Sequence, residues 1–428
     1  MKQRLTAFIM SLIMSLMQVS AGFAAPERGP GVLNLAPSDT YSPYQWGLMN
    51  DGGLSLNTSD LRKESFQELY QSYRDWYRSG QLGIPPRSLE PGDYENRSIQ
   101  AKECIDINAA SGFLLYRKQD ADGGQARRDT VVAIIDTGVD TEHPELKEAL
   151  WTNTDEIPDD GIDNDGNGCI DDVHGYNFFD HNARIRDNKL SDLHGTHAAG
   201  TIGAAYGNGG ITGITDNAHV KLMILKALGG NGAGSEESVV EAIRYAEANG
   251  ADICNLSLGT TKYMPKLEQE IANSSMLFVV AAGNGDERGI GYDTDQNPVY
   301  PADYASENII SVANLMFDGN LDVSSNYGAE SVDIAAPGSY ILSTAPGGKF
   351  EFLTGTSMAA PMVTGVCAMV YSYRPELGVL GVKEAVLNSA KKLDSLSGKV
   401  KCGGIPDLYA AMQYGLETET GESQTGEN

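Results

Sequence analysis

Val-Val-Ala-Ile-Ile-Asp-Thr-Gly, residues 131–138, is the stretch that decides the fold. Five apolar residues follow one another and end at Asp136, where a Thr-Gly pair favours a turn. A strand with one face in water alternates polar and apolar residues. An unbroken apolar run therefore indicates a strand that is covered on both faces, as in a parallel sheet.

Further apolar runs of this kind follow, and helical patterns separate them. The runs lie at residues 220–225, 252–256, 278–282, 309–313 and 332–335. An amphipathic helix is predicted over residues 238–248, between the first two runs. Strands that alternate with crossover helices build a parallel sheet with helices on both sides. We therefore predict an α/β fold with a mostly parallel central sheet flanked by helices on both faces.

The amino-acid composition limits the classes of protein to which this chain can belong. The chain has 428 residues, enough for one large domain or two ordinary ones, and its hydrophobic fraction of 41% supports a full core. The net charge is −27, from 31 basic and 58 acidic residues, and such a surface repels phosphate backbones. We therefore expect no nucleic-acid partner. The acidic residues serve either to keep the protein soluble or to hold calcium.

Residues 1–25 have the features of a secretory signal peptide. Lys2 and Arg4 precede an apolar run over residues 5–19, and small residues lead up to Ala24 and Ala25, where cleavage is expected. The alternative is an uncleaved anchor helix, although the run is short for a membrane span. We predict a secreted protein with no stable membrane span after cleavage.

The five cysteines are scattered along the chain and form no Cys-x-x-Cys metal pattern. Cys254 and Cys367 lie in apolar runs, where a thiol behaves as a small core residue. A disulfide bridge between Cys104 and Cys402 is an alternative that the spacing leaves open.

Three further short motifs carry reactive or polar side chains. Gly-Thr-Ser-Met-Ala-Ala-Pro occupies residues 355–361, His-Gly-Thr-His residues 194–197, and Ala-Ala-Gly-Asn residues 281–284. A serine hydroxyl is a poor nucleophile until a base lies within hydrogen-bond reach, and that base needs an orienting partner. Ligands of parallel sheets bind at the carboxyl ends of the strands, which is where the predicted strands place Asp136 and Asn284.

At these motifs the chain resembles the subtilisin family of serine endopeptidases. The resemblance covers about residues 44–412 and is interrupted by an insertion near the start. It implies peptide-bond hydrolysis through an acyl-enzyme by Asp136, His194 and Ser357, in the Asp, His, Ser order known for this family. Asn284 is the implied oxyanion donor, and Thr356 is expected to brace it.

The motif match also separates the two neighbouring histidines. It makes His194 the general base and leaves His197, one helical turn later, as a structural residue. Ser357 is expected at a helix N-terminus with Pro361 in the first turn, where proline is tolerated.

The resemblance further implies that substrate lies as an extended strand between residues 227–232 and 255–259. The expected lining residues are Gly230, Gly232, Leu256, Ser257, Leu258, Gly259, Ala281 and Gly283. Val299 lies where many relatives have a smaller residue and would shorten the side-chain pocket. Asp286 and Glu287 at its mouth would instead favour a basic side chain, and the sequence does not decide between these alternatives.

A loop rich in Asp, Asn and Gly at residues 159–172 is typical of a calcium site, because hard cations need six to eight oxygen ligands. The expected ligands are Asp163, Asp165, Asn167, Asp171 and Asp172. The start of this loop resembles an EF-hand, although His174 stands where that motif has Glu. A solvated acidic loop is the alternative. Glu145 and Asn208 match imperfectly a region that holds another calcium in relatives.

The expected organisation is a signal peptide at 1–25, a lead-in at 26–50, an atypical insert at 51–104, the catalytic domain at 105–414 and a disordered acidic tail at 415–428. The insert includes a predicted helix over residues 65–78 with an aromatic stripe. Relatives usually have a longer inhibitory propeptide, so the insert is a candidate for part of that role.

The resulting expectation is a secreted, calcium-stabilised serine endopeptidase that acts on proteins or peptides. Two alternatives are kept: a dedicated processing protease with one native substrate, and an inactive calcium-binding surface protein on a protease scaffold. The sequence gives no indication of the oligomeric state.

Overall fold

The computed structural model describes residues 27–28, 38–57, 82, 98–121, 128–187, 190–215 and 218–416. The expected signal peptide, the predicted helix over 65–78 and nearly all of the acidic tail lie outside these residues. Within the described part of the chain, no helix is both long and apolar enough to cross a membrane.

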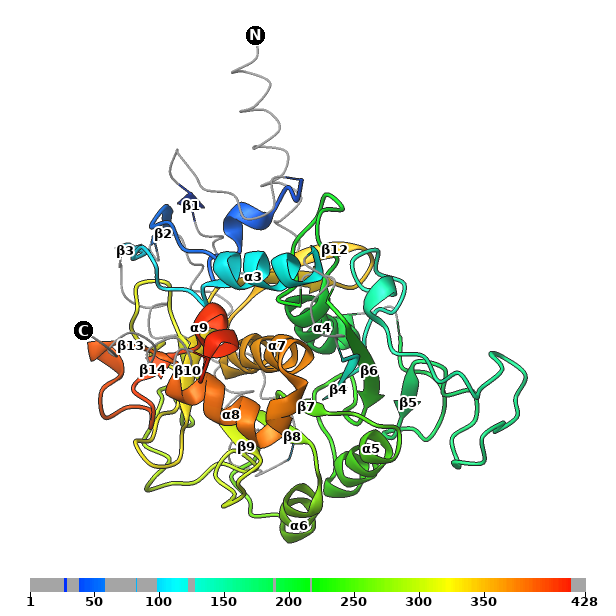
Figure 1. Cartoon of the computed structure of the whole chain (residues 1–428). Coiled ribbons are helices and arrows are strands. Elements are labelled where there is room, and N and C mark those ends of the chain that lie inside the picture. Colours follow the sequence, from blue (N-terminus) through cyan, green and yellow to red (C-terminus); the bar gives the residue numbers. More distant parts are fainter. Residues whose placement is uncertain are drawn as a thin grey trace, which may run out of the picture.

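A seven-stranded parallel sheet forms the centre of the molecule (Figure 1). Its spatial order is β10-β9-β8-β7-β4-β6-β5. The strands are β4 (Thr130–Asp136), β5 (Gly175–Asn177), β6 (Val220–Lys226), β7 (Ile253–Leu256), β8 (Leu277–Ala281), β9 (Ile309–Leu315) and β10 (Ile334–Pro337). The predicted strands are confirmed to within about two residues at each end, and the predicted α/β class is confirmed with them.

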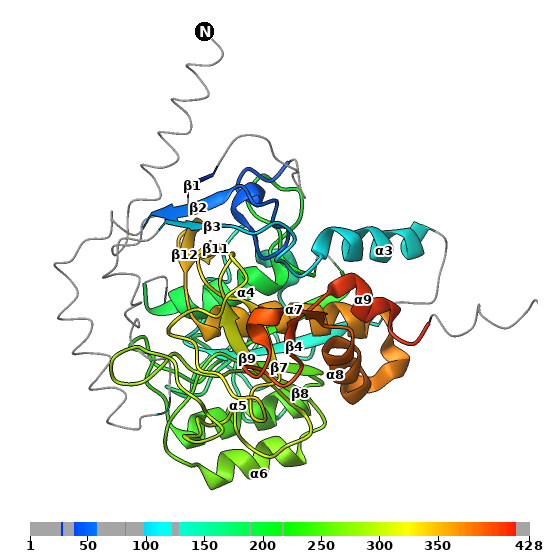
Figure 2. The same cartoon turned by 90° about the vertical axis from the view of Figure 1, so that its left-hand side faces the viewer.

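Helices cover both faces of this sheet. The α-helices are α3 (Ala109–Ala121), α4 (Leu193–Gly203), α5 (Glu236–Ala248), α6 (Pro265–Asn273), α7 (Thr356–Tyr373), α8 (Gly378–Asn388) and α9 (Leu408–Gln413). Figure 2 shows α5 and α6 on one side of the sheet and α4 and α7 on the other. The alternation of side chains along β4 follows this division. Val132 and Ile134 join the hydrophobic cluster of α4 and α7, while Ala133 and Ile135 join that of α5 and α6.

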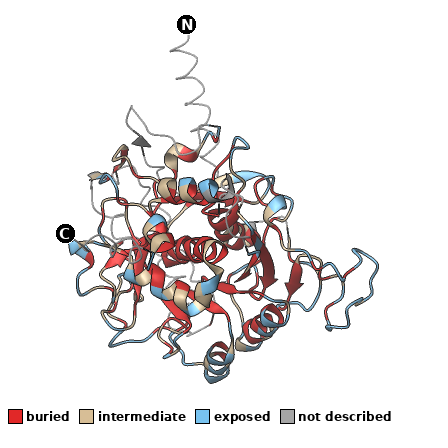
Figure 3. Cartoon of the chain, viewed as in Figure 1, coloured by how far each residue is buried: buried red, intermediate tan, exposed pale blue. Residues whose placement is uncertain are grey.

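Helix α7 is buried almost from end to end, as Figure 3 shows at the centre of the molecule. A helix that is apolar all round lies in a core rather than at a surface. Its first turn carries Ser357, so the most enclosed helix of the fold holds the expected nucleophile.

Smaller elements surround this core. Three short strands, β1 (Glu27–Arg28), β2 (Leu54–Asn57) and β3 (Ser98–Gln100), form an antiparallel sheet. The pairs β11 (Ile341–Ala345) with β12 (Lys349–Leu353) and β13 (Lys391–Lys392) with β14 (Gly404–Ile405) are also antiparallel. The 3-10 helices are η1 (Ser42–Tyr44), η5 (Lys147–Ala149), η6 (Leu190–Asp192), η7 (Pro375–Leu377) and η8 (Asp394–Leu396).

All five cysteines are free thiols, so the alternative of a bridge between Cys104 and Cys402 is wrong for this structure. Cys254 and Cys367 are buried, as their apolar surroundings predict, and burial raises the pKa of both thiols.

Candidate active site

Asp136 and His194 meet where strand β4 ends and helix α4 begins. The Nδ1 atom of His194 lies 3.0 Å from Oδ1 and 2.9 Å from Oδ2 of Asp136. The Asp136 carboxylate is buried, and the Thr137 N–H donates to its Oδ1 at 2.6 Å. The carboxylate therefore fixes the ring orientation and makes Nδ1 the protonated nitrogen.

Gly195 permits this contact. A β-carbon at Gly195 would lie 2.2 Å from the carbonyl oxygen of Gly138 and 3.2 Å from the Asp136 side chain. Only a residue without a side chain lets the first turn of α4 lie directly on the turn that follows β4.

His197 points to a different part of the molecule. Its Nε2 atom lies 2.9 Å from the Ile341 carbonyl oxygen and 3.2 Å from that of Glu351, so His197 ties α4 to the β11–β12 hairpin. The ring is fully buried, and burial lowers its pKa to about 3. Because both partners are acceptors, Nε2 carries the proton of a neutral ring.

Ser357 forms a reciprocal pair with Ser257. The Ser357 hydroxyl donates to the Ser257 carbonyl at 3.2 Å, and the Ser257 hydroxyl donates to the Ser357 carbonyl at 2.9 Å. Pro361 explains the second bond. Proline has no N–H, so the Ser357 carbonyl four residues earlier lacks its helical donor, and Ser257 replaces it. Pro361 lies inside α7 in its second turn, which corrects the expected position in the first turn.

The sheet brings this serine pair to the same edge as Asp136 and His194. Asn255 of β7 pairs with Ile134 of β4, so Ser257 follows β7 at the level where Asp136 ends β4. The Nε2 atom of His194 is buried and has no hydrogen-bond partner among the described residues. Ser357, His194 and Asp136 are therefore placed along the same edge of the sheet.

Asn284 is held through its side-chain oxygen. The Thr356 N–H and hydroxyl both donate to Asn284 Oδ1, at 2.8 and 2.9 Å. The Thr356 hydroxyl in turn accepts from the Gly283 N–H at 3.2 Å. Since the oxygen already accepts twice from Thr356, the Nδ2 donors of Asn284 face away from it, next to the start of α7.

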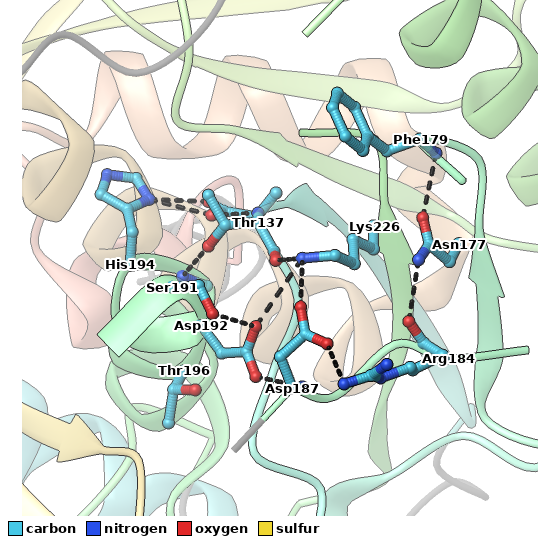
Figure 4. Close-up of polar contacts among 12 residues, drawn as sticks. Thr137, Asn177, Phe179, Arg184, Asp187, Ser191, Asp192, His194, Thr196 and Lys226 are labelled. Carbon is cyan, nitrogen blue, oxygen red and sulfur yellow. Dashed lines mark hydrogen bonds and ion pairs between the residues drawn. The ribbon is translucent and has the colours of Figure 1, made fainter. Parts of the chain in front are cut away.

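A buried ion cluster that the sequence analysis missed supports this edge (Figure 4). The Lys226 ammonium, at the end of β6, donates to the Thr137 carbonyl and lies 3.6 Å from Asp187 Oδ2 and 3.7 Å from Asp192 Oδ1. Asp192 directly precedes α4 and is fully buried. Lys226 therefore connects the turn after Asp136 to the residue that sets the start of the His194 helix. The sequence feature that could have revealed this cluster is a lysine at the end of an apolar strand beside β4.

Replacing Lys226 by methionine is expected to lower the free energy of unfolding by about 3 kcal/mol or more, because it leaves the buried Asp192 without a cation. Urea unfolding measures the loss. Arg184→Met is the matched control, since Arg184 pairs with the same Asp187 at 2.8 Å but is 65% exposed. An exposed pair contributes about 0 to 1 kcal/mol. Equal losses in the two variants would contradict the role of Lys226.

The predicted substrate-binding residues lie on three separate segments, at 230–232, 256–259 and 281–283. Gly230 and Gly232 lie in a tight turn, where the Gly232 N–H donates to the Gly229 carbonyl at 2.8 Å. The side chains of Leu256 and Leu258 are buried in the α5 and α6 cluster. Ser257 braces Ser357 instead of lining an open pocket.

Val299 lies between the other predicted wall residues. A β-carbon at Gly259 or at Gly283 would lie 3.3 or 3.5 Å from Val299 Cγ1. Asp286 pairs with the Arg288 guanidinium at 2.7 Å. Its charge is therefore already matched, which favours the alternative in which Val299 limits the pocket.

The acidic loop projects from the body of the molecule next to β5 (Figure 1). Asp165 and Asp172 come together with Glu156, and one carboxylate oxygen of each lies within 4.8 Å of the others. The Asn167 amide donates to Asp165 at 3.0 Å and to Asp172 at 2.9 Å. The Asn153 amide also donates to both carboxylates. The sequence analysis missed Glu156 and Asn153 because they precede the quoted loop.

Asp163 and Asp171 do not join this cluster. Both oxygens of Asp163 accept from backbone N–H groups of residues 166–168, and the Gly168 N–H above all holds the pKa of this carboxyl below its usual value. Asp171 accepts from the N–H groups of Asp160 and Gly161. These two carboxylates hold the loop in shape.

Glu145 and Asn208 do lie close together, in a second acidic cluster. Glu145 is buried, and its Oε2 has no partner among the described residues. Burial raises its pKa to about 7, an Asn208 hydrogen bond opposes the rise, and the nearby Asp39 charge adds to it. Asp39 is also buried, and the sequence analysis did not single it out.

The chain is similar to known proteins over most of this fold. The model of the subtilase family matches residues 127–404. The major intracellular serine protease of Bacillus subtilis (strain 168) is 38% identical over 257 residues, which cover 59% of this chain and 72% of that protein. Subtilisin-like protease 1 of Plasmodium berghei (strain Anka) is 32% identical over 379 residues, covering 85% and 58%. The alkaline protease of Alkalihalobacillus alcalophilus is 33% identical, and the chain spans 60% of its length.

Proposed function

Because the chain belongs to the subtilase family of serine endopeptidases, we propose that it cleaves peptide bonds with Asp136, His194 and Ser357 as its catalytic triad. The observation that carries the proposal is the bond from His194 Nδ1 to both oxygens of the buried Asp136. It leaves Nε2 as the basic nitrogen, at the sheet edge to which Ser257 fixes Ser357.

In the proposed reaction His194 Nε2 takes the proton of Ser357 as Oγ attacks the carbonyl carbon of the substrate. Asp136 stabilises the imidazolium that forms. His194 then gives the proton to the leaving amine, and an acyl-enzyme on Ser357 remains. Water activated by the same nitrogen releases the second product and restores the serine.

Asn284 and the start of α7 are proposed to stabilise the oxyanion. The Thr356 contacts occupy Oδ1 of Asn284 and turn its Nδ2 donors towards the start of α7, where the first N–H groups of a helix have no intrahelical partner. One such donor is worth about 3 to 4 kcal/mol in the transition state.

Two alternatives are separated by simple assays. Turnover of an unrelated unfolded protein such as casein is expected for a general endopeptidase. Cleavage of one native substrate with no turnover of casein would favour a dedicated processing protease. A folded protein that cleaves neither substrate and does not react with serine-directed reagents would be an inactive scaffold.

We further propose that calcium binds at the cluster of Glu156, Asp165 and Asp172. Glu156 and Asp172 are buried, and no Lys or Arg pairs with the three carboxylates among the described residues. Three like charges so close together repel one another unless a cation lies between them. Carboxylate and amide oxygens are the ligands that calcium takes, and Asn167 is a further candidate. Bound calcium would stabilise the loop and take no part in catalysis.

Chelation of calcium is expected to lower the thermal midpoint of unfolding. A ligand that binds only the native state contributes about 3 kcal/mol at one hundred times its Kd. Asp165→Asn should remove most of the difference between scans with and without chelator. Asp171→Asn is the control, because its carboxylate bonds to backbone amides, and it should keep the difference. An unchanged wild-type midpoint after chelation would return the loop to a solvated acidic segment.

Secretion is also proposed, on the basis of the basic, apolar and small-residue pattern over residues 1–25. The word intracellular in the name of the Bacillus subtilis relative argues for the other location. N-terminal sequencing of protein collected from culture medium should find a first residue directly after Ala24 or Ala25. Recovery of the whole chain only inside cells would contradict secretion.

A further inference from the structure

Asn284, the proposed oxyanion donor, lies in a segment whose backbone conformation only glycine adopts readily. The two residues that flank it are Gly283 and Gly285, with positive φ angles of 98° and 93°. Glycine leaves the backbone many conformations, so contacts from other parts of the chain have to fix this segment. Thr356 fixes it at the Gly283 N–H and at the Asn284 side chain. The remaining peptide groups of the segment need a different partner.

Asn326 is that partner, through both ends of its side chain and through its main chain. Its Nδ2 atom donates to the Ala282 carbonyl at 3.0 Å, and its Oδ1 atom accepts from the Gly285 N–H at 3.1 Å. The Asn326 N–H itself donates to the Gly283 carbonyl at 3.0 Å. One residue therefore bonds to the main chain before and after Asn284.

Asn326 is firmly held in its own place. Its side chain is 1% exposed, and a β-carbon at Gly283 would lie only 2.7 Å from its Nδ2 atom. Its Oδ1 atom accepts a second hydrogen bond, from the Tyr292 N–H at 3.3 Å, and the next residue, Tyr327, donates to the Tyr292 carbonyl at 3.1 Å. A buried amide with its donor and its acceptor both bonded cannot turn without losing these bonds.

The contacts of Asn326 are not those of a local turn. The side-chain bonds join residues that are 41 and 44 positions apart in the sequence. A second buried asparagine, Asn308, likewise bonds to backbone carbonyls, those of residues 271, 274 and 276. Those carbonyls belong to the end of helix α6 and the turn that follows it, whereas the partners of Asn326 lie directly beside Asn284. The two residues therefore offer a matched comparison.

We infer that Asn326 is a positioning residue, which aims the Asn284 amide by fixing the backbone on both sides of it. The inference rests on the proposed function, because Asn284 needs such aim only where a negative oxygen forms. Without the Asn326 side chain, Gly283 and Gly285 could change conformation and move the amide. A displacement of about 1 Å at a reacting centre can lower a rate about 100-fold.

Replacing Asn326 by alanine should lower kcat on a peptide amide substrate about 100-fold and leave KM nearly unchanged. The split is expected because the oxyanion forms in the transition state and is absent from the bound substrate. Asn308→Ala is the control. It also removes buried hydrogen bonds, so urea unfolding should show a loss of stability, but its kcat should equal that of the wild type.

A double-mutant cycle tests whether Asn326 acts through Asn284. Asn284→Ala removes the donor and should lower kcat by about 10²- to 10³-fold. When Asn284 is already alanine, Asn326→Ala should lower kcat further by less than about threefold, because no donor is left to position. An equal loss in both backgrounds would overturn the inference, and so would a wild-type kcat in the single variant.

A second variant keeps the test decisive if Asn326→Ala does not fold. Asn326→Asp has nearly the same size and keeps the oxygen that accepts from the N–H groups of Gly285 and Tyr292. It loses the N–H that donates to the Ala282 carbonyl. In the same cycle it should lower kcat less than alanine does, again only where Asn284 is present.

The outcomes separate this inference from the proposed function. If Ser357→Ala retains the wild-type kcat, the proposed function fails. If Ser357→Ala and Asn284→Ala are both strongly impaired, while the Asn326 variants retain the wild-type kcat or lose equally in both backgrounds, the positioning role of Asn326 alone is overturned.

Discussion

Ser357→Ala is expected to lower kcat by about 10⁴- to 10⁶-fold and to leave the protein folded. The variant lacks the oxygen that attacks the substrate carbonyl, whereas the bond from Ser257 to the carbonyl of residue 357 does not depend on the lost hydroxyl. Initial rates on a peptide substrate measure the loss, and circular dichroism checks the fold.

Ser372→Ala is a matched control for this experiment. Ser372 is a buried serine of the same helix, and its hydroxyl bonds to Tyr116 at 2.8 Å. The control is expected to lose about 1 kcal/mol of stability and to keep the wild-type kcat. A Ser357→Ala protein with near wild-type rates would mean that another group is the nucleophile.

The second large effect is expected from His194 and should be absent from His197. His194→Ala removes the base that deprotonates Ser357, so kcat should fall about 10⁴- to 10⁶-fold at nearly unchanged stability. His197→Ala should instead cost about 3 kcal/mol of stability, because it opens a cavity in a fully buried place and removes the hydrogen bonds to the Ile341 and Glu351 carbonyls. The assignment is wrong if the folded His197 variant is inactive and the His194 variant turns over substrate.

The pH dependence of stability distinguishes the histidines further. His197 has a folded pKa of about 3, below the usual value of 6.5, so the unfolded chain binds more protons between these limits. Its contribution to stability is therefore complete above about pH 6.5 and is lost as the pH falls towards 3. His197→Ala should remove this part of the acid dependence, which urea unfolding at several pH values measures.

The central sheet was predictable because each of its strands is indicated by a short stretch of the sequence alone. An unbroken apolar run needs cover on two faces wherever it occurs, and β4, β6, β7, β8, β9 and β10 all begin and end near the predicted limits. The pairing of Asp136 with His194 follows from the family motifs, and the structure adds the tautomer and the burial.

Contacts between distant segments were not predictable in this way. Ser257 was expected in a pocket wall, but the missing N–H of Pro361 makes it the partner of Ser357. Lys226 was missed because its partners Asp187 and Asp192 approach it only after folding.

In the acidic loop, residue spacing alone was misleading. Asp171 has a positive φ of 57° and turns its carboxylate towards Asp160 and Gly161, while Glu156 from outside the loop approaches Asp165 and Asp172. Spacing identifies which oxygens are available, and the backbone conformation decides which of them meet.

The most direct test of the proposed triad is a fluorophosphonate probe on the folded, full-length protein, followed by peptide mapping in a mass spectrometer. Reaction requires a serine oxygen that a neighbouring base activates. The account predicts a single adduct on Ser357, no adduct in Ser357→Ala, and a strong loss of labelling in His194→Ala. A folded protein that is not labelled, or that is labelled at another serine, would contradict it.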